Sequence, residues 1–165
     1  MKKLILLAAA SAVVSAPAMA APGDTSTAQG SATAEVVAPI TLTHVTNAAL
    51  DFGTFTTGDN GGTVVVDLAG DGTDSGDVTL IGGSAEAADA FTVAGDASRS
   101  FSITTSAGSV GNGTDTMNFT TNAPTDGTLN GSGAAAFSVG GTLTVAGGES
   151  AGVYTGTYDV TVAYN

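Results

Sequence analysis

The sequence contains no cysteine, no tryptophan and a single histidine. Without cysteine, the chain has no disulfides, no thiol chemistry and no thiolate metal sites. With His44 as the only imidazole, few acid–base or nucleophilic schemes can be built from the remaining side chains. We therefore expect a protein that is not an enzyme and that carries no cofactor.

Basic residues are equally scarce, and two of the three lie at the start of the chain. Lys2 and Lys3 precede the apolar run Leu4–Val14, and Ala18-Met19-Ala20 forms a small-residue cleavage pattern. This arrangement predicts a cleavable helical signal peptide over residues 1–20. The apolar run falls short of the ~20 residues that span a bilayer. We expect export through the periplasm to the cell surface or extracellular space, without membrane insertion of the mature chain.

The charge of the predicted mature chain, residues 21–165, is strongly negative. Arg99 is its one basic residue against fifteen acidic ones, which gives a net charge of −14. Nucleic acids and anionic lipids bind proteins largely through Lys and Arg. We therefore exclude both as partners, whereas a basic protein partner or a cation remains compatible with this charge.

Apolar residues are sparse but strongly patterned. Val, Ile, Leu and Phe make up 29 of the 145 mature residues, and they recur at every second position between Gly-rich turns. This alternation predicts short strands with one buried face, so we expect an all-β, antiparallel, immunoglobulin-like sandwich over residues 31–165. Residues 21–30 read as a flexible arm, and Ser84–Ala90 is the one helix-like stretch. The residues expected to point inward together are Val64, Val66, Leu80, Phe91, Val93, Phe101, Ile103, Phe137, Val139, Val160 and Val162.

Two alternating segments are candidates for assembly with a partner. The closing segment reads as one long strand that presents Tyr158, Val160, Val162 and Tyr164 on one face, either to a partner sheet or within its own sandwich. Near the N-terminus, the alternating residues are Ala32, Ala34, Val36, Ala38, Ile40 and Leu42. That segment is either donated to a neighbouring copy or is the domain's own first strand, with Pro39 marking an edge or a bulge.

Four blocks of the sequence resemble a bacterial family named domain of unknown function 4402. They are Val37–Thr43, Leu50–Thr54, Val139–Val145 and Gly152–Asn165. The family is similar to fimbrial subunits and spore-coat-U-like pilins. This resemblance implies an immunoglobulin-like, pilin-like sandwich that a periplasmic chaperone and an usher carry to the surface, where copies self-associate. It implies no enzymatic activity.

Two sequence motifs raise the possibility of hydrolase activity or of Ca²⁺ binding. Residues 148–152 match the hydrolase pattern G-x-S-x-G, which needs a strand, a sharp turn and a helix. Here a predicted strand follows, and His44 precedes the serine, so we interpret the motif as a hairpin turn. A Gly-rich loop also gathers four acidic residues that suit Ca²⁺ or simply form a solvated hairpin end. These residues are Asp67, Asp71, Asp74 and Asp77.

Two functions are therefore weighed from the sequence. The first is a structural subunit of a fimbria-like surface assembly with a role in adhesion or coating. The second is a monomeric secreted module, Ca²⁺-stabilised in one version, that binds carbohydrate or matrix. The absence of tryptophan, together with three tyrosines confined to the closing segment, favours the first.

Overall fold

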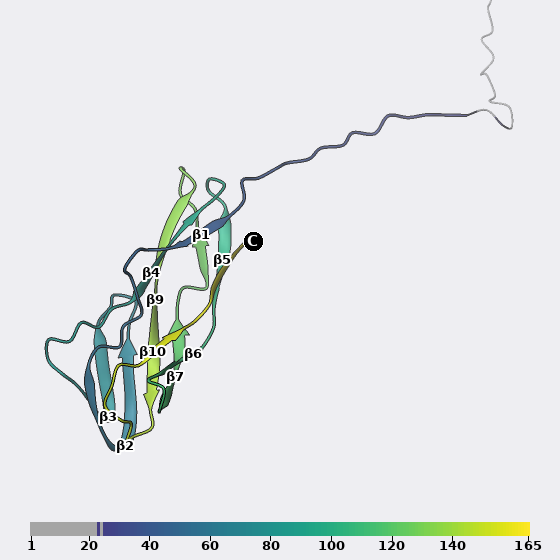
Figure 1. Ribbon diagram of the computed structural model, residues 1–165. Coiled ribbons are helices and arrows are strands. Elements are labelled where there is room, and N and C mark those ends of the chain that lie inside the picture. Colours follow the sequence, from purple (N-terminus) through teal and green to yellow (C-terminus); the bar gives the residue numbers. More distant parts are fainter. Residues whose placement is uncertain (1–22, 24) are drawn as a thin grey trace, which may run out of the picture. The chain divides into compact units, whose positions relative to one another are not determined.

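The computed structural model describes residue 23 and residues 25–165 (Figure 1). The predicted signal peptide, residues 1–20, lies outside this range. Residues 36–165 form one compact unit, and residues 25–40 contain no strand. The described part of the chain is all-β with antiparallel pairing, as predicted, and none of it is helical. It accordingly offers no helix of the length and apolarity that crossing a bilayer requires.

Eleven strands follow one another within residues 25–165 and are separated by Gly-rich turns. In chain order they are β1 (Thr41–His44), β2 (Phe55–Val66), β3 (Gly72–Leu80), β4 (Asp89–Ala94), β5 (Ser100–Thr105), β6 (Gly108–Gly111), β7 (Thr116–Asn122), β8 (Asp126–Thr128), β9 (Ala134–Val145), β10 (Thr155–Thr157) and β11 (Val160–Tyr164).

The strands form two antiparallel sheets. The larger has the order β1-β4-β9-β7-β6-β10, and β2 joins it between β3 and β9. The smaller has the order β11-β5-β8. Strand β9 runs through the length of the larger sheet in Figure 1. Its first half, Ala134–Val139, pairs with β4, and its second half pairs with β2 and β7.

The core is divided into two hydrophobic clusters rather than one. The first lies around Val64, Phe119 and Leu143, on strands β2, β7 and β9. The second lies around Val93, Phe101 and Leu129, where the smaller sheet packs against β1, β4 and β9. Every residue predicted to point inward is buried or packs against one of these clusters. The alternation therefore identified the inward faces, but not their division between two clusters.

Two predicted segments have a different conformation. Ser84–Ala90 is not helical, because Ala87 forms an antiparallel bridge with Asp51 and Asp89 begins β4. The high helix propensity of the four alanines in this stretch is overridden here by pairing with a distant segment. The alternation at residues 32–40 forms no strand either, and pairing with β4 starts only at Thr41.

The closing segment is also not one long strand. Strand β10 pairs with β6 in the larger sheet, whereas β11 pairs with β5 in the smaller sheet. Tyr158 and Asp159 form the crossing between the two sheets. The period-two pattern continues across this crossing, so the sequence pattern alone did not reveal that the chain changes sheets.

Candidate functional site

A groove of about 1280 Å³ lies between two segments that are far apart in the sequence. One wall is the segment Ala48–Thr57, which leads into β2. The other is Glu149–Val160, which contains β10. The floor is apolar and comes mostly from the first hydrophobic cluster; it consists of Phe91, Val110, Met117, Phe119 and Leu143.

Both walls contain strand edges that lack a strand partner among the described residues. Phe55–Thr57 pairs with β3 on one side, but the pairing of β2 with β9 begins only at Gly62. Thr155–Thr157 is the end strand of the larger sheet, and β6 is its one strand partner in the part of the chain that the structure describes. Because a strand bonds to neighbours on both sides, these two edges still offer backbone N–H and C=O groups.

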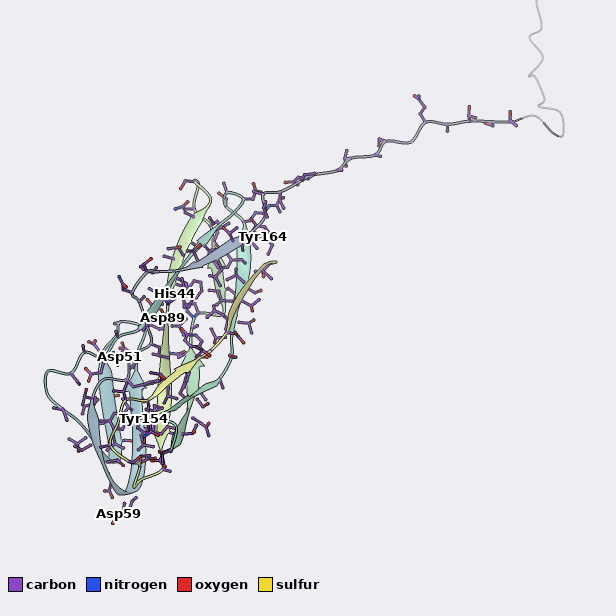
Figure 2. All side chains as sticks on the ribbon, in the orientation of Figure 1. His44, Asp51, Asp59, Asp89, Tyr154 and Tyr164 are labelled. Atoms are coloured by element: carbon purple, nitrogen blue, oxygen red, sulfur yellow. The ribbon has the colours of Figure 1, made fainter. Side chains whose placement is uncertain are left out.

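At one end of the groove lies Asp89, the only charged side chain that is buried in the described part of the chain, with 5% exposure. His44 Nε2 lies 2.6 Å from Asp89 Oδ1, and the Tyr158 hydroxyl donates to Oδ2 at 2.8 Å. The Ala90 amide donates to Oδ1 at 2.7 Å. Figure 2 shows His44 and Asp89 side by side. The carboxylate is therefore compensated by three partners, as a buried charge requires.

Asp89 also affects the chemistry of Tyr158. Burial, followed by the hydrogen bond to Asp89 and the negative charge of that carboxylate, raises the pKa of the Tyr158 hydroxyl well above its ordinary value. The hydroxyl therefore stays protonated and keeps donating to Asp89. This contact joins the crossing between β10 and β11 to β4, and it fixes the end of the second groove wall.

The G-x-S-x-G motif lies in the loop between β9 and β10 and helps to anchor that same wall. Ser150 donates to the Asp115 carboxylate through both its amide and its hydroxyl, and Tyr154 donates to the Ser150 carbonyl at 2.8 Å. The bonds from Ser150 lower the pKa of the Asp115 carboxyl. A loop and strand follow the serine, so the motif lacks the strand–turn–helix context that a hydrolase needs.

The four aspartates weighed as a Ca²⁺ site are spread along the β2–β3 hairpin. Asp67 accepts the Ala69 and Asp71 amides in the turn, at 2.8 and 2.9 Å, whereas Asp77 accepts Asn60 Nδ2 at 2.7 Å. Asp71 immediately precedes β3 and Asp77 lies within it, so a strand rise of ~3.3 Å per residue places them ~20 Å apart. No group of three or more metal-ligating side chains comes together within the described residues.

The residues predicted to mediate assembly have different environments. Val36 is 96% exposed, and Ala38 is exposed as well, but Ile40 and Leu42 pack against the second hydrophobic cluster. Val160, Val162 and Tyr164 pack against that cluster from β11. The Tyr164 hydroxyl donates to the Ala38 carbonyl at 3.0 Å and accepts the Asp96 amide at 2.6 Å. Tyr158 lies at the groove instead.

Sequence reasoning found neither the groove nor the contacts of Asp89. His44 lies 45 residues before Asp89 in the chain, and Tyr158 lies 69 residues after it. No local spacing connects them. The one sequence signal was an aspartate at the start of an apolar strand, Asp89-Ala90-Phe91. A carboxylate buried at such a position must be paired or hydrogen-bonded, which indicates a partner from elsewhere in the chain.

The model of one protein family, described as a domain of unknown function (DUF4402), matches residues 40–164. The chain belongs to this family. The match begins one residue before β1 and ends at the last residue of β11, so it covers both sheets and the groove. No curated protein and no solved structure matches the chain.

Proposed function

We propose that the chain is an exported structural subunit of a fimbria-like assembly, which passes through the periplasm and serves adhesion or coating at the bacterial surface. Its N-terminal pattern Lys2-Lys3, apolar run and Ala18-Met19-Ala20 support export. The similarity of its family to fimbrial subunits supports assembly into a fimbria-like structure and the involvement of a chaperone and an usher.

The observation that carries the proposal is the position of β11. This strand lies at the end of the smaller sheet, and within residues 25–165 it pairs with β5 alone. Val160, Val162 and Tyr164 face the second hydrophobic cluster, and the residues between them, Thr161 and Ala163, are exposed. A regular strand with an unpaired outer edge is a site for addition of a strand from another chain, because backbone hydrogen bonds continue the sheet.

Residues 25–38 are the segment that we propose adds to this edge. They contain no strand, and Val36 exposes an apolar side chain almost completely. An extended segment outside any sheet gains backbone hydrogen bonds when it joins an exposed sheet edge. We propose that this segment of one copy adds to the β11 edge of another. Ile40 and Leu42 lie outside the donated part, because they pack in their own domain.

Lysine substitutions on β11 test the proposal. Lys on an edge strand discourages strand addition. The double variant Thr161→Lys with Ala163→Lys changes only exposed side chains and leaves the inward-facing residues intact. Purified mature wild-type protein is expected to form oligomers as its concentration rises, measured by size-exclusion chromatography with light scattering, and the double variant is expected to stay monomeric.

Thr104→Lys is the matched control, because Thr104 is exposed and pairs directly with Thr161, but on the central strand β5. This variant is expected to assemble like the wild type. Assembly of the β11 variant at wild-type concentrations contradicts the proposed edge. A wild-type protein that is monomeric and cooperatively folded at all concentrations favours the alternative, a secreted module that binds carbohydrate or matrix.

A further inference from the structure

We infer that the groove between Ala48–Thr57 and Glu149–Val160 binds an extended, basic peptide segment of a partner protein. In that segment apolar side chains alternate with Lys or Arg. The inference is independent of the proposed assembly, because the groove and the β11 edge are different surfaces with different strands.

The backbone of the two walls indicates an extended peptide. Phe55–Thr57 and Thr155–Thr157 each have one edge without a strand partner among the described residues, and both line the groove. An extended chain placed there can bond to either edge. The volume of about 1280 Å³ also exceeds the ~300–1,000 Å³ of most small-molecule pockets.

The floor indicates which side chains point inward. Phe119 and Leu143 lie beneath the groove, and Leu50, Phe55 and Tyr154 are partly buried around it. Alternate side chains of a strand point to opposite faces. A bound segment therefore directs every second residue onto this apolar floor, and these residues are expected to be aliphatic.

The charges of the lining select a basic partner. Asp51, Asp89, Glu149 and Asp159 line the groove. Among the described residues that line it there is no Lys or Arg, and the remaining titratable groups are His44, Tyr154 and Tyr158. Asp89 is held by His44 and Tyr158, and Glu149 accepts the amides of its own loop. Asp51 and Asp159 are exposed, so they are the carboxylates that reach basic side chains of a ligand.

The same charges argue against a second copy of this chain as the occupant. Residues 25–40 carry Glu35 and no basic residue, so their addition brings a negative charge to an acidic groove. Opposite charges across an interface favour correct encounter, and like charges disfavour it.

Three peptide probes test the inference against the purified mature protein. The first alternates Val with Lys over about nine residues, the second replaces each Lys by Glu, and the third is residues 25–40 of this chain. Fluorescence anisotropy is expected to show at least tenfold tighter binding of the Lys peptide than of either other probe, with an affinity that falls as salt rises. Hydrogen exchange is expected to show protection of the amides in Phe55–Thr57 or Thr155–Thr157.

Charge-neutralising variants locate the site. Asp51→Asn with Asp159→Asn is expected to weaken the Lys peptide about three- to tenfold, because exposed ion pairs each contribute modestly. The asparagine oxygen can still accept the Gly53 amide that bonds to Asp51. Asp74→Asn, on β3 outside the groove, is the control and is expected to change nothing. The inference is overturned by equal binding of the Lys and Glu peptides, by tightest binding of residues 25–40, by protection confined to β11, or by no binding.

Discussion

The Tyr158 hydroxyl donates a 2.8 Å hydrogen bond to the buried carboxylate of Asp89, 69 residues earlier in the chain. This contact joins the crossing between the two sheets to the first residue of β4. The Tyr158 ring also makes edge contacts with Phe91 and Phe119. One side chain therefore supports the groove floor, the second groove wall and the buried charge at the same time.

Removal of this hydroxyl should lower the stability of the fold. Tyr158→Phe keeps the ring contacts and deletes one of the three partners of the Asp89 carboxylate, so we expect a loss of about 1–3 kcal/mol in the free energy of unfolding. Urea denaturation measures it. Tyr154→Phe is the control, since its hydroxyl donates to the Ser150 carbonyl and, at 3.4 Å, to the Asp115 carboxylate, which is not buried. Equal losses in the two variants would contradict the special role of Asp89.

Stability should also depend on alkaline pH through Tyr158. Burial, then the hydrogen bond and charge of Asp89, raise the pKa of this hydroxyl in the folded protein above that in the unfolded chain. The resulting stabilisation is complete below the unfolded pKa of about 10 and is lost as the pH rises above it. Urea midpoints measured across this range should fall more steeply for the wild type than for Tyr158→Phe. Parallel curves would show that another group causes the loss.

The fold class was predictable because the information lies in short stretches of the chain. Alternation around Val64, Phe101 and Val139 identified the inward faces, and Asp-Gly, Asn-Gly and Gly-Gly turns separated the strands. The same local reasoning failed where a distant partner decides the conformation. Ala87 pairs with Asp51 in an antiparallel bridge, so the expected helix at Ser84–Ala90 does not form. Strands β10 and β11 are separate because their partners, β6 and β5, belong to different sheets.

The candidate site was less predictable than the fold. Its walls, Ala48–Thr57 and Glu149–Val160, lie about a hundred residues apart in the chain, and an unpaired strand edge has no sequence pattern of its own. The acidic composition did point toward a basic partner. It did not indicate which carboxylates are engaged internally, as Asp89 is, and which are exposed, as Asp51 and Asp159 are.

The second hydrophobic cluster depends on Phe101, which is 1% exposed and whose ring lies against Gly127. Phe101→Ala should cost about 3–5 kcal/mol in the free energy of unfolding, because it removes a fully buried ring and leaves a cavity. Chemical denaturation measures the change. Val153→Ala, at a side chain that is 83% exposed, should change stability by less than about 0.5 kcal/mol. A small loss at Phe101 would mean that the two sheets do not share this cluster in solution.

Strand donation by the N-terminal segment can be separated from folding by comparing Val36 with Ile40. Val36 is 96% exposed, whereas Ile40 packs against the second hydrophobic cluster of its own domain. If residues 25–38 add to the β11 edge of a neighbour, Val36→Asp should abolish SDS-resistant ladders of the mature protein. The reason is that a charge at this position opposes burial in an interface. The urea midpoint of this variant should equal that of the wild type when both are measured at a concentration too low for assembly, because assembly itself adds stability.

Ile40→Asp should instead lower the urea midpoint, because it places a charge against the domain's own core. Val153→Asp is the control for the added charge, since Val153 is also largely exposed but lies in the loop before β10. Its ladders should match those of the wild type. Ladders that persist in Val36→Asp would show that copies associate through another surface. A Val36→Asp variant with a lower urea midpoint than the wild type, at a concentration where both are monomeric, would show that Val36 serves its own domain.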